Sequence, residues 1–502
     1  MVRSQAFRTG LAIAAVFALL GGILLSSHIL FDSPLDGLAR GPKATAVDDN
    51  PEAAEQAENA QEHGEAFAAA VETGKAGATI PTGTTAATGW TGEHPISTTA
   101  DDWEPAVATD PHTGPQGQVY AYLLTTRYGD SKPCSGNCPT PYIALYTSTN
   151  GGVTWSANGT PLCACKGSGQ YDPIIEVVPS TGAVYALYLN GFNVMFTKST
   201  DHGATWSAPV KTYGTVSWTD KPILVVGANG NDVYVSFNGP TGGDPYLAQS
   251  HDGGATWTQR KMVDSNRYIY AFDGGIDAGG TVYFAETSLL YGGGGNKNTY
   301  PTGTIDEHVF TITGNGSTIT DHLVASVQPG ITCVAVGCKP DYYLGHAALA
   351  VWGTGQGVLL YDGATTTGGN QLIYSASTTN GFSSWTAPNA LTSASEEALE
   401  PAARATGASD IRAFYSQTSG GGNVDAWNTW YITSLNGGAT WSAPVKISDA
   451  TNGASYKTAA GYTEVYGDYG EIGITSTGKT IAAWGEGTSY TGPGGVWVNV
   501  QP

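Results

Sequence analysis

The chain has 502 residues, of which 69 are glycine and 10% are aromatic. That length allows several small domains or one large repeat domain, so internal repeats are the first feature to look for. The formal net charge is −21, from 42 acidic and 21 basic residues. Nucleic-acid binding needs cationic groups against the phosphates, so this balance argues against a nucleic-acid partner.

The N-terminal segment predicts export. Arg3 and Arg8 precede an apolar run, interrupted only by "SSH", that ends at Phe31. A run of about 20 apolar residues is long enough to span a bilayer. Since no small-x-small cleavage site follows closely, we expect residues 1–31 to be an uncleaved signal anchor, with a cleaved signal peptide as the alternative. Either would place the remaining chain outside the cytoplasm, at the cell surface or secreted.

Residues 32–95 are rich in Ala, Glu, Thr and Gly and contain little to bury, which predicts a linker. Within the linker, Asn50 is placed to cap a helix, Pro51 to occupy its first position and Gly74 to end it. We therefore expect a short helix between the membrane and the main domain.

The six cysteines occur as three close pairs, and in an exported protein they predict disulfides. The pairs are Cys134 with Cys138, Cys163 with Cys165, and Cys333 with Cys338. A bridge within the second pair would be strained, which favours bridges from that pair to the first. The alternative is a zinc site with four thiolates from the first two pairs.

From Trp103 onward the sequence predicts an all-β domain. Runs such as "QVYAYLLTT", "AVYALYL", "DVYVSF" and "TIAAWGE" alternate apolar, β-branched and aromatic residues, which is typical of strands. Turn residues separate these runs about every 8 to 12 residues, the spacing of a repetitive β array.

One phrase, Ser-x-Asp/Asn-x-Gly-x-x-Trp, recurs within this array. Its copies are Ser148 to Trp155, Ser199 to Trp206, Ser250 to Trp257 and Ser434 to Trp441, with a degenerate copy from Asn380 to Trp385. The Asp or Asn side chain can accept hydrogen bonds from the turn backbone, the glycine can adopt a positive φ, and the tryptophan can pack on the apolar layer beneath. The phrase therefore predicts a hairpin turn.

These copies resemble the Asp-box, or bacterial neuraminidase repeat, of the sialidase superfamily of β-propellers. The resemblance covers about Trp103 to the C-terminus and implies a single propeller domain over residues 96–502. It also implies that each box joins the third and fourth strands of a blade, on the outer rim and away from the working face.

Two counts predict seven four-stranded blades, whereas the resemblance to known sialidase domains implies six. The box tryptophans are spaced 51, 51 and 56 residues apart, and a gap of 128 residues from Trp257 to Trp385 leaves room for two blades. We expect the missing hairpin at Asn315 and Gly316. Seven segments could open an inner strand: "WEPAVATD", "YDPIIEVV", "TDKPILVV", "AFDGGIDA", "LGHAALAV", "LEPAARAT" and "GDYGEIGI". The last blade needs a strand from the N-terminal side, near "TTAATGW".

The openings of the inner strands should converge at the mouth of the central channel. They carry Glu104, Asp172, Asp220, Asp273, Glu400 and Asp468, with His346 in the remaining blade. One interpretation is that each carboxylate caps a turn before its strand. The other is that a ring of like charges holds protons at neutral pH or binds a cation such as Ca²⁺, and so forms a site.

Sialidases use three arginines to bind the substrate carboxylate, an aspartate as acid/base, and a tyrosine nucleophile activated by a glutamate. Tyr469 resembles that tyrosine and Glu400 its activating glutamate. Glu104 stands where the first arginine of the family's motif is expected, which would repel a sialic acid. The arginines within the predicted propeller are Arg127, Arg260, Arg267, Arg404 and Arg412. Of these, Arg127, Arg267 and Arg404 are our candidates for substrate binding.

Two functions from different classes fit these features. The chain is either a surface glycoside hydrolase of altered, sialidase-like specificity, with two ring carboxylates as acid and as base or nucleophile, or a non-catalytic propeller that binds a glycan or a protein. We expect a glycan or glycoconjugate partner, a monomer, and no required cofactor, with Ca²⁺ as a stabilising ion in the second case. A lyase acting on acidic polysaccharides would need a basic cleft that the sequence does not offer.

Overall fold

The computed structural model describes residues 86–97, 100–128, 141–162, 168–217, 219–290, 301–331, 345–418, 427–448, 457–458, 461–462, 470–485 and 495–501. The predicted signal segment, the linker helix, all six cysteines, Asp468 and Tyr469 lie outside these residues. No helix in the described ranges has the length and apolar character that a membrane crossing requires.

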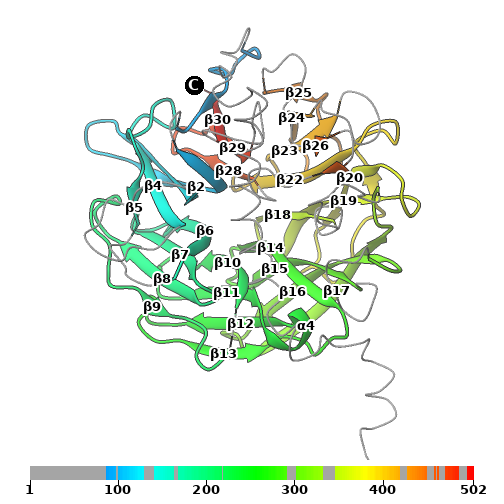
Figure 1. The fold of residues 1–502 in the computed structure, drawn as a ribbon, viewed down its shortest axis with the longest axis horizontal. Helices are drawn as coiled ribbons and strands as arrows, with labels where there is room; N and C mark the ends of the chain where they lie inside the picture. The colour runs from blue at the N-terminus through cyan, green and yellow to red at the C-terminus, as the bar shows by residue number, and fades with distance from the viewer. Residues whose placement is uncertain are drawn as a thin grey trace, which may run out of the picture.

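Seven antiparallel four-stranded sheets form a ring, which confirms the seven-blade prediction (Figure 1). Each sheet is a blade, numbered here along the chain, and its first strand lies innermost. Blade 1 contains β2 (Asp101–Thr113), β3 (Val119–Tyr128), β4 (Tyr142–Ser148) and β5 (Thr160–Pro161). Blade 2 contains β6 (Gln170–Val177), β7 (Val184–Asn190), β8 (Val194–Ser199) and β9 (Val210–Lys211). Blade 3 contains β10 (Asp220–Val226), β11 (Val233–Asn238), β12 (Pro245–Ser250) and β13 (Thr258–Lys261).

Blades 4 and 5 follow the third copy of the repeat, and blade 5 contains the degenerate copy. Blade 4 contains β14 (Tyr268–Ile276), β15 (Val282–Leu289), β16 (Ile305–Thr313) and β17 (Thr318–Val327). Blade 5 contains β18 (Ala347–Trp352), β19 (Gln356–Ala364), β20 (Gln371–Thr378) and β21 (Asn389–Ala390). The hairpin of β16 and β17 turns at Asn315, whose φ is +52°, as the sequence predicts.

The last two blades close the ring. Blade 6 contains β22 (Ala398–Ala405), β23 (Ile411–Thr418), β24 (Trp427–Ser434) and β25 (Val445–Lys446). Blade 7 contains β28 (Glu471–Ile474), β29 (Thr480–Gly485) and β30 (Val496–Val500), and its outer strand is β1 (His94–Pro95) from the N-terminal side. The expected closure is present, although β1 lies a few residues after the "TTAATGW" segment. Two short elements lie outside the sheets of the ring: the pair β26 (Lys457–Thr458) and β27 (Gly461–Tyr462), and one helical turn, α4 (Pro240–Gly243).

Each copy of the repeated phrase forms the turn between the third and fourth strands of its blade. In blade 3 the Ser250 hydroxyl donates to Asp252 and accepts the Gly254 N–H, at 2.8 and 2.9 Å. Gly254 has a φ of +84°, and a Cβ there would lie 2.1 Å from Phe196 of blade 2. Trp257 packs on the same phenylalanine, at 5.3 Å between ring centroids. The turn therefore shapes its own hairpin and also joins two blades.

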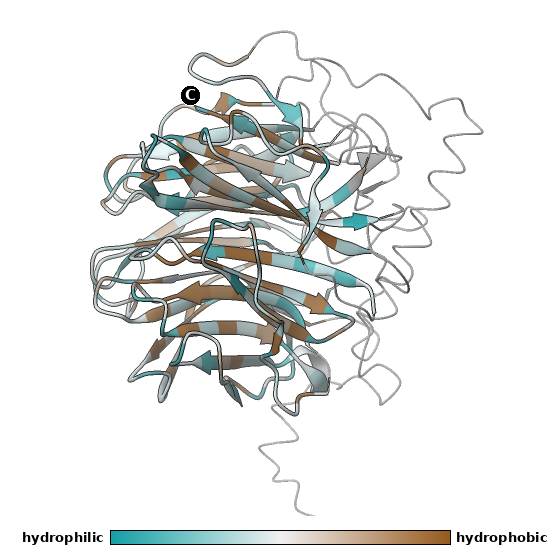
Figure 2. Cartoon of the chain, turned by 90° about the vertical axis from the view of Figure 1, so that its left-hand side faces the viewer, coloured by the Kyte–Doolittle hydropathy of each residue, from teal (hydrophilic) through white to brown (hydrophobic). Residues whose placement is uncertain are grey.

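The core of the ring lies between adjacent sheets. Strand residues alternate, so that one set faces the preceding blade and the other the following blade. In the side view, apolar residues run along the strands with polar residues among them (Figure 2). Val233, Val235 and Phe237 of β11 pack towards blade 2, whereas Tyr234 packs towards blade 4.

The two faces of the ring differ in the length of their connections. In an antiparallel blade, the second-to-third connection and the crossover to the next blade leave on the face where the inner strands begin. The strand ends that are farthest apart in sequence lie on this face: β15 ends at Leu289 and β16 begins at Ile305, and β17 ends at Val327 and β18 begins at Ala347. Turns such as 353–355 on the other face are short. Long connections over a rigid frame commonly carry function, so we take this face as the functional one.

We expect Ser250→Ala to destabilise the protein by about 1 to 2 kcal/mol, because the buried N–H of Gly254 would lose its acceptor. Urea unfolding measures the change. Leu435→Ala, at a 76% exposed position in the equivalent turn of blade 6, is the control and should stay near wild type. An unchanged midpoint for Ser250→Ala would contradict this account of the turn.

Candidate functional site

Five inner strands contain a β-bulge near their start, where one extra residue opposes the partner strand. In four of them the extra residue precedes a proline and has a positive φ: Glu104, Asp172, Lys221 and Glu400, with φ between +45° and +56°. These four residues define the bulge position. Such backbone conformations are costly for non-glycine residues and are often found at functional sites.

The bulges place the predicted acids at different heights along the channel. Glu104, Asp172 and Glu400 occupy the bulge position, but in blade 3 this position is taken by Lys221. Asp220 lies one residue earlier, opposite Asn238, and is 0% exposed. The predicted acids of blades 1, 2, 3 and 6 therefore do not all occupy the same position of their strands.

His346 and Glu400 share the carboxylate of Asp362. The His346 ring lies 2.9 Å from Asp362 through Nδ1, and the N–H of Glu400 donates to the same carboxylate at 2.9 Å. His346 is 3% exposed. Asp362 therefore links blade 5 to the bulge of blade 6.

Glu104 and Asp172 form a buried acidic pair between blades 1 and 2. The Glu104 carboxylate accepts the Asp172 N–H at 2.9 Å and the Thr126 hydroxyl at 2.5 Å. Burial, followed by the charge of Asp172, raises the pKa of Glu104 well above its ordinary value. Tyr171 lies beside the pair, and burial together with the two carboxylates raises the pKa of its hydroxyl to about 12.

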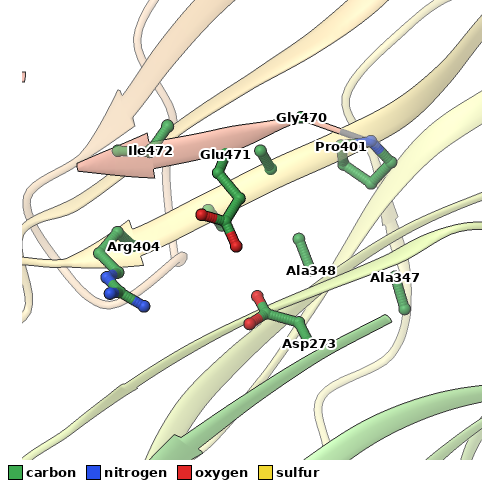
Figure 3. A pocket seen from close by; sticks show the side chains of 10 residues that line it. Asp273, Ala347, Ala348, Pro401, Arg404, Gly470, Glu471 and Ile472 are labelled. Carbon is green, nitrogen blue, oxygen red and sulfur yellow. The ribbon is translucent and has the colours of Figure 1, made fainter. Parts of the chain in front are cut away.

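The centre of the ring contains a cavity of about 30 Å³. Asp273, Arg404 and Glu471 turn towards one another there, from blades 4, 6 and 7 (Figure 3). The rest of the wall is formed by Ala347, Ala348, Pro401, Ala402, Ala403, Gly470 and Ile472. A cavity of this size has room for about one water molecule.

Arg404 is fixed by an acid from the opposite side of the ring. Its Nη2 lies 2.9 and 3.0 Å from the two carboxylate oxygens of Glu176 in blade 2. The two side chains remain 35% and 24% exposed, so the ion pair keeps contact with solvent in the channel. Three acids and one arginine therefore meet at the centre of the ring.

The two acids of the cavity hold protons at unusually high pH. Burial raises the pKa of Asp273 to about 7, partly offset by N–H donors from Leu349 and Gly274 and by Arg404. Burial likewise raises the pKa of Glu471 to about 8, against the opposing effect of Arg404 and the Val107 N–H. Near neutral pH one group can therefore donate a proton while the other accepts one.

The three arginines predicted to bind substrate lie in different blades. Arg127 is 3% exposed and makes a two-point ion pair with Asp102, at 2.8 and 3.0 Å. Arg267 donates to Ser288 and Thr304 and lies 3.2 Å from Asp306. Arg404 alone among these three lines the central cavity.

The structure brings together two of the predicted residues, Asp273 and Arg404, with two that the sequence analysis missed, Glu176 and Glu471. Both missed acids lie in segments recognised as inner strands. The alternation of side chains along the inner strands could have identified both missed acids. It places four residues on the same face of their respective inner strands: Asp273, Glu471, Glu176 and Arg404. Within the described ranges, no group of three or more His, Cys, Asp or Glu residues is arranged to hold a metal ion.

No protein-family model and no curated protein matches the chain. Among solved structures, it is similar to an ulvan lyase of polysaccharide lyase family PL25, at 10% identity and a TM-score of 0.47, over 81% of this chain and 95% of the other. It is also similar to the intramolecular trans-sialidase from Ruminococcus gnavus, at 12% identity and a TM-score of 0.41, over 83% and 98%. A GH74 enzyme from Niastella koreensis matches at 15% identity and a TM-score of 0.36, over 78% and 64%.

The raised pKa values predict that the protein is more stable in mild acid than in base. The unfolded state ionises Asp273 and Glu471 near their ordinary values of 3.8 and 4.5, whereas the folded state keeps their protons to about pH 7 and 8. Their contribution to stability is therefore complete at low pH and is lost as the pH rises from about 4 to 8.

We expect the Tm to fall between pH 5 and pH 9, and to fall less in Glu471→Gln, whose amide cannot ionise. Calorimetry across this range checks both. A Tm that rises throughout the range, or an identical pH profile in the variant, would contradict this assignment.

Proposed function

We propose that the protein hydrolyses glycosides at the centre of its functional face. One observation supports this most directly: two carboxylic acids with pKa values near neutrality share a small cavity with an arginine that is itself fixed by an ion pair. Hydrolysis of a glycosidic bond requires a proton donor for the leaving oxygen and a carboxylate that activates water or attacks the sugar.

In this proposal Glu471 is the general acid, because its pKa of about 8 keeps it protonated at neutral pH. Asp273, with a pKa of about 7, is the base that accepts a proton from water. The cavity has room for that water but not for a sugar ring. The substrate would therefore lie across the mouth, between the bulges, with only its scissile bond reaching the two acids.

The charges around the mouth favour an uncharged or cationic sugar. Arg404 is already paired with Glu176, and the bulge position carries three acids, Glu104, Asp172 and Glu400, against one base, Lys221. A substrate carboxylate would face more negative than positive charge. We therefore propose a specificity different from sialic acid, in a fold that resembles the sialidase superfamily.

The second candidate is a non-catalytic propeller that binds a glycan. It is favoured by the fact that both acids also accept a backbone N–H from a neighbouring blade, Leu349 for Asp273 and Val107 for Glu471. Each could therefore serve only to join two blades. For either candidate we propose export to the cell surface through residues 1–31, and disulfides among the six cysteines.

The test is hydrolysis of a panel of fluorogenic glycosides, including a sialoside, by the full-length protein. We expect turnover of a neutral or amino sugar, and a loss of about 100-fold or more in kcat for Asp273→Asn and for Glu471→Gln. Asp321→Asn, on the outer strand β17 of blade 4, is the control and should keep wild-type activity.

Turnover that survives both cavity substitutions would contradict the proposed roles. Absence of turnover on every substrate, with retention of the protein on a glycan array, would instead support the binding propeller.

A further inference from the structure

The interface between blades 3 and 4 is apolar along most of its length and polar at the end near the functional face. Its apolar part includes Val225 and Tyr234 of blade 3 and Phe284 of blade 4. Its polar part consists of Asp220, Ser236, Asn238 and Glu286, each 0% exposed. We call these four residues the interblade polar cluster.

Strand register places the cluster on facing surfaces of the two blades. Asp220 pairs with Asn238 across β10 and β11, and Ser236 lies two residues before Asn238, so all three face the same way. The Ser236 hydroxyl donates to Glu286 Oε1 of blade 4 at 2.6 Å. Since this contact crosses the interface, the side chains of Asp220 and Asn238 also face blade 4.

Two members of the cluster have polar atoms without a partner in the described part of the chain. These are Oε2 of Glu286 and both amide atoms of Asn238. Buried polar atoms are nearly always hydrogen-bonded or ligated, because leaving them unpaired costs free energy. Without a ligand, burial raises the pKa of Glu286 to about 8, so its carboxyl would carry a proton.

The chemistry of the donors indicates which ligand fits. The cluster offers two carboxylates, an amide oxygen and a hydroxyl oxygen, and it contains neither imidazole nor thiolate. Such a set suits a hard divalent cation, and Ca²⁺ accepts the irregular geometry and the added waters that a site between two sheets would require. A water molecule could satisfy Asn238, but the cluster also contains the carboxyl of Glu286, whose Oε2 has no partner in the described ranges.

We propose that Asp220, Ser236, Asn238 and Glu286 bind a calcium ion that joins blades 3 and 4. The site uses two acids together with an amide and a hydroxyl, so it does not depend on a cluster of three acidic or histidine side chains. It is independent of the proposed hydrolysis, because none of the four residues lines the central cavity.

The test compares full-length protein after EGTA treatment with the same protein after dialysis into CaCl₂. We expect the calcium-treated protein to retain calcium by elemental analysis and to melt about 2 to 5 °C higher. Glu286→Gln and Asn238→Leu should each lose the retained calcium and the shift in Tm. In EGTA, Glu286→Gln should melt no lower than wild type, since the amide removes the buried acid.

Glu307→Gln is the matched control. Glu307 is also in blade 4, is also 0% exposed, and is also held by one hydroxyl, that of Thr287 at 2.7 Å. This variant should keep the calcium response. No retained calcium in the wild-type protein, or a calcium-dependent Tm that persists in both Glu286→Gln and Asn238→Leu, would overturn the proposal.

Discussion

A ring of sheets depends on the contact between its last and first blades, because each blade buries its faces only against its two neighbours. Here β1 completes blade 7 from the N-terminal side, because His94 pairs with Val498 and Pro95 with Trp497. The completed blade then packs on blade 1 through a shared apolar core. Once the ring is closed, β28 lies beside β2, and the Glu471 carboxylate can accept the N–H of Val107. The arrangement of acids at the centre is therefore a consequence of closure.

The architecture was largely predictable because its signals are local. The repeated turn is defined within eight residues, and its spacing counts the blades directly. The hairpin at Asn315 could be placed although it lacks the tryptophan, since its flanking strands alternate and its turn contains Asn-Gly. β1 was harder to place, because a strand of two residues has no alternation, and its position is fixed by the free edge of β30.

The candidate site was only partly predictable. Asp273 and Arg404 were identified, but Glu176 and Glu471 were not. In blade 2 a bulge inserts one residue before Glu176 and changes which side chains face the channel. For the same reason Asp220, rather than Lys221, was assigned to the mouth. The ion pair of Arg404 and Glu176 joins residues 228 positions apart, and no spacing in the sequence indicates such a contact. It exists only because blades 2 and 6 face each other across the ring.

The bulges at the mouth show how this frame could change its chemistry. Residues 104, 172, 221 and 400 hold Glu, Asp, Lys and Glu in nearly the same left-handed backbone conformation, each followed by proline. The same backbone conformation therefore occurs with an acidic and with a basic side chain, and the sign of the charge at each position is not dictated by the bulge itself. The charge at the mouth of the channel therefore depends on which residues occupy these four positions. A substitution at one of them would change the charge that a ligand meets there.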